Sequence, residues 1–155
     1  MRVRSCFMGI ALMSLVVAPV RAQDVSRDST RSLSLNVSAG LSRYGPHGIT
    51  GLEYSMNRWL AARGELFFGR NWTNDPVFSR MTAVNVTAVV SAPEIARVTP
   101  YLLGGYGLSF SQGIGPTLGP IGGGGLRFRL GRISPYIETR AQRLVGVPIS
   151  VGIRF

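Results

Sequence analysis

The sequence predicts an all-β protein, built as an eight-stranded antiparallel up-and-down transmembrane β-barrel. Three observations predict this fold. Apolar residues alternate with polar or small residues in repeated segments after residue 30, nearly every charge in these segments falls on the face opposite the apolar one, and the chain ends in such a segment on Phe155. Successive side chains of a strand point to opposite faces of its sheet. An apolar face backed by a polar one suits a wall between lipid and a polar lumen.

The N-terminus has the composition of a secretory signal peptide over residues 1–22. Arg2 and Arg4 precede an apolar run over residues 7–20, and the small residue Ala22 follows at the expected cleavage site. The run of about 14 residues is shorter than the roughly 20 that span a bilayer as a helix. We therefore expect cleavage after Ala22, which also removes Cys6, the single cysteine. Residues 23–30 then form a short polar leader, and residues 31–155 form the barrel domain.

The first four predicted strands each carry an apolar face with a period of two. They span residues 31–43, 47–56, 60–70 and 80–92. In chain order, their apolar faces are Leu33, Leu35, Val37, Ala39 and Leu41; Leu52, Tyr54 and Met56; Leu60, Ala62, Leu66 and Phe68; and Val84, Val86, Ala88 and Val90. The opposite faces carry small, polar and charged residues, as expected for strands with one side toward lipid.

The last four predicted strands repeat the pattern. They span residues 99–111, 119–130, 134–143 and 146–155. Their apolar faces are Leu102, Tyr106, Leu108 and Phe110; Leu126, Phe128 and Leu130; Ile137, Thr139 and Ala141; and Val147, Ile149, Val151, Ile153 and Phe155. Strands of about 9 to 13 residues match the length that crosses a bilayer at a tilt, and an even number of strands places both chain ends in the periplasm.

The predicted connections are short at both ends of the barrel. Those facing the periplasm lie at residues 57–59, at 93–98 and around Arg132. Those facing outside are Tyr44 to Pro46, Asn71 to Ser79, Gln112 to Leu118 and Leu144 to Gly146. Such short outer loops limit contact with a ligand or receptor.

The strand charges are predicted to form a structural network in the lumen. The residues concerned are Glu53, Arg63, Glu65, Arg127, Arg129, Glu138, Arg140 and Arg154. A turn centred on residue 58 places Glu53 opposite Arg63, and a turn centred between residues 132 and 133 places Arg127 opposite Glu138. Side chains can fill an eight-stranded barrel, so these ions are largely dry and must pair.

Several chemical roles are not favoured by the sequence. The three glutamates could be catalytic carboxylates, but each has an arginine near it and no nucleophile beside it, so we predict no catalytic residues. The single histidine, His47, lies in a predicted turn and is expected to be solvated. One histidine and no cysteine in the mature chain also argue against a transition-metal site. The run Gly122 to Gly125 lacks the helix and the Gly-Lys-Ser/Thr that a phosphate-binding loop requires, and no cofactor is expected.

Charge and aromatic residues indicate which surroundings the barrel meets. After the signal peptide, fourteen arginines and no lysine stand against seven acids, a formal charge of about +7. The arginines are scattered singly, which argues against nucleic acid and suits anionic phospholipid and lipopolysaccharide headgroups. The residues expected to form interfacial aromatic girdles are Tyr54, Trp59, Tyr101 and Phe155 at the inner ends, and Tyr44, Phe68, Trp72, Phe78 and Phe110 at the outer ends.

Four segments together resemble the small outer-membrane β-barrel family of the OmpA/OmpX type. They are PYLLGGYGLSF (residues 100–110), GGGLRFRL (123–130), SPYIETRA (134–141) and the ending PISVGIRF. The resemblance implies a barrel in a bacterial outer membrane, a salt-bridge network in its lumen and no wide pore. It also implies that Phe155 is part of the C-terminal signal read by the barrel-assembly machinery.

The resemblance does not imply one activity, because members of the family differ in function. We expect a non-enzymatic, monomeric integral barrel with a structural or surface-interaction role. The alternatives are a narrow gated channel for small solutes or ions, a lipid-modifying enzyme with a His and a Ser near the outer leaflet, and a soluble lipocalin-like carrier. The carrier would hold apolar residues inside and charges outside, opposite to the pattern here.

Overall fold

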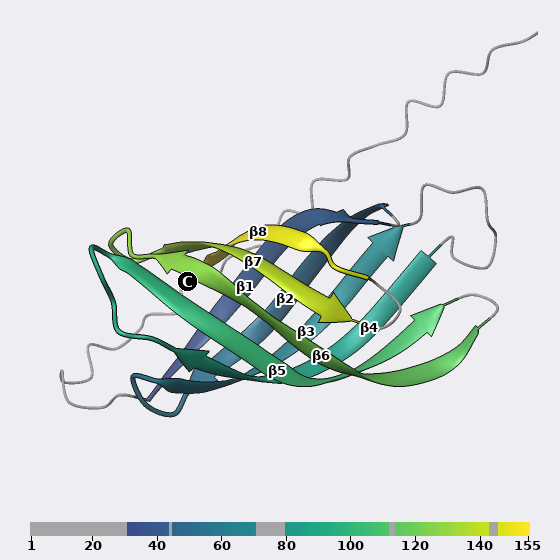
Figure 1. Cartoon of the computed structure of the whole chain (residues 1–155), viewed down its shortest axis with the longest axis horizontal. Helices are drawn as coiled ribbons and strands as arrows, with labels where there is room; N and C mark the ends of the chain where they lie inside the picture. Colours follow the sequence, from purple (N-terminus) through teal and green to yellow (C-terminus); the bar gives the residue numbers. More distant parts are fainter. Residues whose placement is uncertain (1–30, 44, 71–79, 112–113, 143–145) are drawn as a thin grey trace, which may run out of the picture.

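The computed structural model describes residues 31–43, 45–70, 80–111, 114–142 and 146–155. Its strands are β1 (Ser32–Ser42), β2 (Gly45–Ser55), β3 (Leu60–Arg70), β4 (Arg80–Ser91), β5 (Val98–Ser111), β6 (Ile114–Phe128), β7 (Ser134–Gln142) and β8 (Ile149–Arg154). Each strand pairs antiparallel with the next, and β8 pairs with β1, so the sheet closes into a barrel (Figure 1). No helix in the described ranges is long and apolar enough to cross a membrane.

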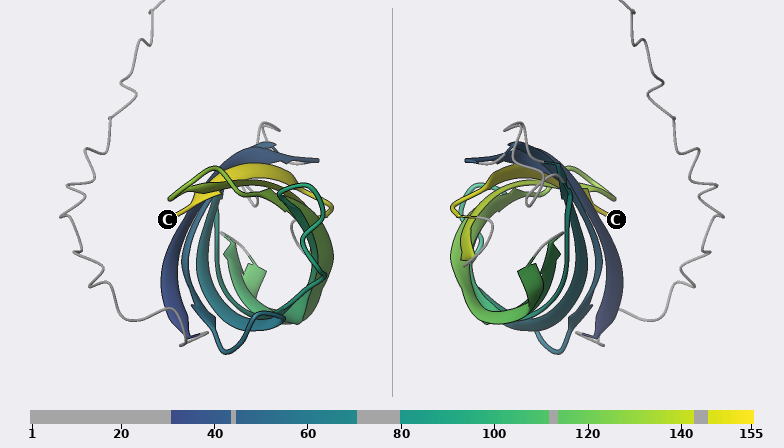
Figure 2. Two further views of the ribbon diagram at one scale, coloured as in Figure 1. Left: turned by 90° about the vertical axis from the view of Figure 1, so that its left-hand side faces the viewer. Right: turned by 90° about the vertical axis from the view of Figure 1, so that its right-hand side faces the viewer.

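The first and last strands close the barrel along a short seam. Residues 36–41 of β1 pair with residues 149–154 of β8, and the Phe155 N–H donates to the Leu35 carbonyl at 3.0 Å just beyond it. Seen from either end, the strands form a ring around the lumen (Figure 2). Closure pairs both edges of the sheet, so neither is left open to other chains.

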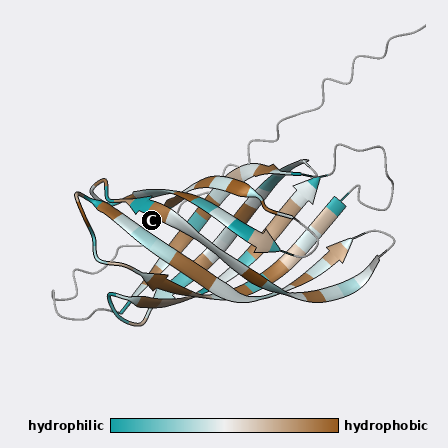
Figure 3. Cartoon of the chain, viewed as in Figure 1, coloured by the Kyte–Doolittle hydropathy of each residue, from teal (hydrophilic) through white to brown (hydrophobic). Residues whose placement is uncertain are grey.

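Side chains alternate between the outside of the barrel and its lumen along each strand. On β4, Val86 is 65% exposed whereas the next residue, Thr87, is 2% exposed. Apolar residues alternate with polar ones along the ribbons (Figure 3). The most exposed of the large apolar residues on the strands are Leu33, Val86, Leu102, Tyr106, Leu118 and Val151. The outer wall is therefore apolar, and the interior holds all the charged residues of the strands except Arg70 and Arg80, which are exposed at strand ends.

The lumen also contains apolar residues that the sequence pattern did not single out. One buried cluster consists of Ile49, Phe67, Met81 and Ala83, and a second consists of Ala61, Val89, Tyr101, Leu103 and Ile121. Tyr101 was expected in the aromatic girdle, and this prediction is wrong. It sits at an inward position of β5, one residue before the outward Leu102, and it is buried.

Two strands begin three or more residues away from the predicted boundary, and the other ends lie within two residues of it. β6 begins at Ile114, so most of the expected outer loop at residues 112–118 is strand, and Leu118 pairs with Leu108 of β5. An irregularity between Ser109 and Ser111 lets the ladder continue toward the turn. β8 begins only at Ile149, after Pro148, which has no N–H for a ladder. The expected loop at residues 71–79 lies outside the described residues, as do the predicted signal peptide and leader.

The turn between β6 and β7 is centred one residue earlier than predicted. Leu130 and Ile133 exchange backbone hydrogen bonds of 3.0 and 3.3 Å, which leaves Gly131 and Arg132 as the loop. Gly131 has a φ of 65°, and Arg132 is not among the residues with positive φ. A glycine with positive φ at the first central position is typical of a type II′ hairpin turn.

This turn corrects one predicted ion pair. Moving a hairpin centre by one residue changes cross-strand partners by two. Arg127 therefore lies opposite Tyr136, and Glu138 lies opposite Gly125, so the predicted pairing of Arg127 with Glu138 is wrong. On the neighbouring hairpin the predicted register holds, with Glu53 opposite Arg63.

The conformation of the β6–β7 turn gives a stability prediction. Gly131→Ala should lower the free energy of unfolding by about 1 kcal/mol, because a side chain disfavours positive φ. An added Cβ meets nothing within 4 Å at Gly131 or at Gly122, and Gly122 has no positive φ. Gly122→Ala is therefore the matched control, and it should leave stability unchanged or slightly raised. Urea titration of the refolded protein in detergent measures both, and equal losses would contradict the turn geometry.

Candidate functional site: the lumen charge network and the basic mouth

Five charged side chains from three strands meet inside the barrel. They are Glu53 of β2, Arg63 and Glu65 of β3, and Glu138 and Arg140 of β7, each at most 3% exposed. All five occupy positions of one parity within their strands, so all point to the lumen. β2 and β3 are neighbours, but β7 lies across the barrel from them. Closure of the barrel is therefore what brings the two groups of charges together.

Arg63 is the centre of this lumen charge network. Its guanidinium lies 2.8 Å from a Glu53 carboxylate oxygen, 2.7 Å from Glu138 and 3.5 Å from Glu65. The contact with Glu53 uses both Nε and Nη2, at 2.9 and 2.8 Å. A guanidinium offers five N–H donors in a rigid plane, which suits it to join several carboxylates at once.

Arg140 and Tyr101 complete the shell around the carboxylates. Arg140 lies 2.5 Å from Glu65 and also bonds Glu138, while the Tyr101 hydroxyl donates to Glu138 at 2.8 Å. The Arg63 guanidinium sits 5.5 Å from the centre of the Tyr101 ring. Each buried carboxylate thus contacts at least two arginines, which compensates for the hydration it loses on burial.

The glycine run on β6 makes room for these side chains. A Cβ built on Gly125 would lie 2.7 Å from the Tyr101 hydroxyl, and one on Gly123 would lie 2.6 Å from the Arg140 Cα. Both distances are too short for a real side chain. The glycines therefore allow Tyr101 and Arg140 to pack against the wall of the barrel.

Arg127 and Arg154 extend the network toward one end of the lumen. Both contact the Glu53 carboxylate, at 3.1 and 3.3 Å, and Arg127 also lies over the Tyr101 ring at 5.1 Å from its centre. Arg154 bonds the hydroxyls of Ser34 and Ser55 as well. Glu53 is therefore shared among three arginines.

Arg129 does not belong to the buried network, although the sequence pattern placed it there. β6 ends at Phe128, and the Arg129 N–H bonds the Arg97 carbonyl in the β4–β5 turn. The Arg129 side chain lies at the rim, is 68% exposed and pairs with Glu94 at 2.6 Å. Its position past the last ladder residue explains why the alternation of the strand does not apply to it.

His47 is buried rather than solvated, so the prediction that it is solvated is also wrong. It lies in β2, shares the inward parity of Glu53, stacks on Phe67 and is 5% exposed. Its Nε2 lies 2.8 Å from the Ser150 hydroxyl, and its Nδ1 has no hydrogen-bond partner among the described residues. The parity of the strand was the signal that could have shown this. No group of three or more His, Cys, Asp or Glu that could hold a metal ion occurs in the described ranges.

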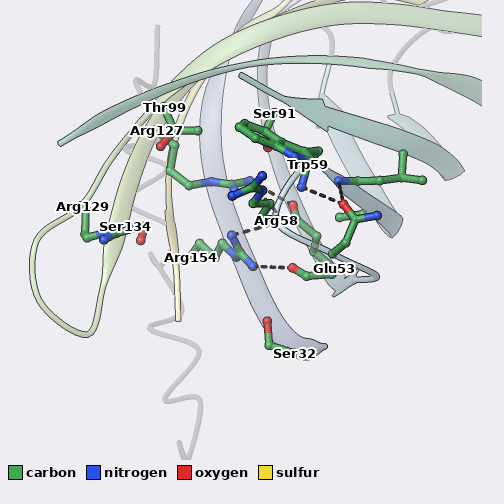
Figure 4. Close-up of a pocket in the computed structure, with 14 residues that line it drawn as sticks. Ser32, Glu53, Arg58, Trp59, Ser91, Thr99, Arg127, Arg129, Ser134 and Arg154 are labelled. Atoms are coloured by element: carbon green, nitrogen blue, oxygen red, sulfur yellow. Dashed lines mark hydrogen bonds and ion pairs between the residues drawn. The ribbon is translucent and has the colours of Figure 1, made fainter. Parts of the chain in front are cut away.

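A cavity of about 330 Å³ opens at the end of the barrel where Arg154 lies. Its wall holds four arginines, Arg58, Arg127, Arg129 and Arg154, together with Glu53 at its base. We call this cavity the basic mouth (Figure 4). The hydroxyl-bearing residues on its wall are Ser32, Ser55, Ser91, Thr99 and Ser134.

Comparison with known proteins agrees with the fold. No protein-family model and no curated protein matches the chain. A de novo designed transmembrane β-barrel is 18% identical over 83% of this chain and 97% of its own, with a TM-score of 0.61. The N-terminal β-barrel domain of Pseudomonas aeruginosa OprF is 12% identical over 81% of this chain and 98% of its own, with a TM-score of 0.58. Neisserial surface protein A is 13% identical over 79% of this chain and 92% of its own, with a TM-score of 0.54.

These comparisons and the closed sheet confirm the predicted fold class, an eight-stranded antiparallel barrel of the transmembrane type. The predicted resemblance to small outer-membrane barrels is confirmed at the level of the fold.

Burial of the network predicts strong coupling between Glu53 and Arg63. A double-mutant cycle with Glu53→Gln and Arg63→Gln should give an interaction of at least about 1 kcal/mol, because neither ion has bulk water as an alternative partner. The exposed pair of Arg129 and Glu94 is the control, and its cycle should give less than about 1 kcal/mol. Urea unfolding in detergent measures both cycles. A buried pair coupled no more strongly than the exposed one would count against the network.

Proposed function

We propose that the protein is a non-enzymatic integral barrel of a bacterial outer membrane, monomeric, with a structural or surface-interaction role. One observation carries the proposal: the barrel has an apolar exterior and an ion-filled interior. Exposed side chains such as Leu102 and Val151, at 68% and 61%, belong to an apolar surface that continues over the strands. Soluble monomers rarely expose apolar patches of more than a few hundred Å². A bilayer accounts for this surface, and a soluble carrier does not.

The orientation of the barrel follows from its strand count. The strand ends at Ser32 and Arg154 lie at the same end, and Figure 1 shows the turns β2–β3, β4–β5 and β6–β7 there as well. In bacterial barrels with an even strand number this is the periplasmic end. The basic mouth then faces the periplasm. The exposed Phe155 directly follows β8, the strand that closes the barrel, which suits recognition of this strand by the assembly machinery.

The surface of the barrel also suits the proposed lipid partners. Tyr54, Trp59 and Phe155 are exposed near the mouth, and Phe68 and Phe110 are exposed near the other end. Aromatic residues at both ends fit the two interfaces of a bilayer. Tyr44, Trp72 and Phe78 lie outside the described residues. Exposed arginines at the periplasmic end, such as Arg58, would meet phospholipid headgroups, and those at the opposite end, such as Arg43, would meet lipopolysaccharide.

A catalytic role fits the geometry less well than a structural one. His47 and Ser150 form a pair that resembles part of a nucleophilic dyad, but Ser150 is 2% exposed and faces the packed lumen. A nucleophile also needs a base that a third group orients. Among the described residues nothing bonds the second nitrogen of His47. The pair is better explained as a polar contact that fixes β2 near β8.

The apolar wall gives a prediction about assembly. Val86→Arg, near the middle of β4, should destabilise the barrel by about 2 to 4 kcal/mol in liposomes, because the guanidinium enters the hydrocarbon. Leu130→Arg, at the rim, is also outward and should lose at most about 1 kcal/mol. Urea titration in liposomes compares the two variants. Equal losses would show that the cost of an outward arginine does not depend on its depth, which would contradict burial of the exposed face in a bilayer.

The filled lumen gives a second prediction, which tests the channel alternative. The purified barrel should conduct little or nothing in planar bilayers, because buried ion pairs occupy its centre. A weak current, if one occurs, should favour anions, since four arginines face three glutamates in the network. Large, stable and non-selective conductance would replace the structural role with that of a channel.

Fractionation of cells tests the location itself. The protein should enter the outer-membrane fraction and should migrate differently in electrophoresis before and after boiling, as folded barrels do. Recovery in the soluble fraction would overturn the proposal. Deletion of Phe155 should lower the amount assembled, whereas Phe155→Tyr, which keeps an aromatic end, should preserve it.

A further inference from the structure

We infer that the basic mouth is a binding site for a phosphate group. This proposal rests on the geometry of one end of the barrel. It goes beyond the proposed structural role and does not depend on which membrane holds the protein. It is formed by side chains from different elements that converge on one cavity. Arg58 comes from the β2–β3 turn, Arg127 from β6, Arg129 from just beyond β6, and Arg154 from the end of β8.

The charges of the mouth are not balanced within it. Glu53 is the carboxylate on its wall, and Arg63, Arg127 and Arg154 already share it. Arg58 stacks on Trp59, with 4.6 Å from its guanidinium to the ring centre, and has no carboxylate partner among the described residues. Arg129 pairs with Glu94, which does not line the cavity, so the four arginines of the mouth stand against two glutamates. The cavity therefore carries surplus positive charge, which favours an anion.

The polar groups of the mouth favour an oxyanion over a simple halide. The buried Nε of Arg127 has no hydrogen-bond partner in the described part of the chain. Five hydroxyl side chains also line the cavity. A phosphate group carries several strong acceptor oxygens and a charge of about −1.5 to −2 at neutral pH as a monoester. Guanidinium forks and hydroxyl donors together match such a group.

The size of the cavity limits what accompanies the phosphate. A volume of about 330 Å³ is at the low end of ligand pockets, enough for a phosphate with a small organic substituent. The phosphate could belong to a small solute or to a lipid headgroup at the rim. Both present the same chemistry to the arginines, and the experiment below separates them.

Trp59 gives a direct probe, because it lines the mouth and the chain has only one other tryptophan, Trp72. In a full-length Trp72→Phe background, refolded in a maltoside detergent that contains no phosphate, the indole N–H resonance of Trp59 reports on the site. Titration with inorganic phosphate should shift this resonance in a saturable manner. Sodium chloride at matched ionic strength should not.

Two variants and one control assign the binding to the arginines. Arg58→Gln and Arg129→Gln should each weaken phosphate binding about tenfold, since each removes a charged donor without touching the buried network. Arg132→Gln is the control, because Arg132 is exposed in the β6–β7 turn at the same end but does not line the cavity. It should bind phosphate as the parent does.

The outcomes are distinct. A missing or unsaturable shift overturns the site, as does a shift that chloride reproduces or that neither variant weakens. If phosphatidylglycerol added to the micelles shifts the resonance and competes with phosphate, the site holds and its ligand is a lipid headgroup. If the lipid has no effect, the site holds and its ligand is a small phosphorylated solute. Loss of binding leaves the proposed function intact, because fractionation tests that independently.

Discussion

The contacts of Arg63 with Glu53, Glu65 and Glu138 are the constraint on which the rest of the barrel depends. These ions are removed from water, so each requires partners of opposite charge at hydrogen-bond distance. The partners come from the neighbouring strands β2 and β3 and from β7, which meets them only when the sheet is closed. A slip by one residue in any of these strands would turn its charges toward the apolar outside. The network thus favours one register and one closed barrel.

The ion network also determines where small residues are needed inside the barrel. Eight strands leave a lumen that side chains can fill, and the large side chains at its centre need small neighbours. Gly123 and Gly125 supply this space beside Arg140 and Tyr101. Tyr101 in turn bonds Glu138 and lies beneath two arginines. The glycine run is therefore part of the packing of the ion network, and its role is structural.

The balance of charge explains the difference between the centre of the barrel and its mouth. At the centre, Arg63 and Arg140 contact three carboxylates, so every charge there has a partner of opposite sign. Toward the mouth, Arg127 and Arg154 must share Glu53 with Arg63. Positive charge therefore accumulates where the lumen meets solvent, because water there lowers the cost of an arginine that lacks its own carboxylate. The charged side chains are thus distributed unevenly: ion pairs fill the centre of the lumen, and a basic cavity lies at one end.

Period-two alternation and a short local turn depend only on nearby residues, so the strands, their inward and outward faces and the pairing of Glu53 with Arg63 could be predicted from the sequence alone. The alternation along β2 and β5 also indicates that His47 and Tyr101 point inward, although a turn was predicted for His47 and the aromatic girdle for Tyr101. The partners of Arg127 and Glu138 were decided by the tertiary structure. Gly131 shifted one hairpin centre by a residue, and the contact of Arg63 with Glu138 joins strands far apart in the chain. Such contacts depend on turn conformation and on how the barrel closes, which local periodicity does not specify.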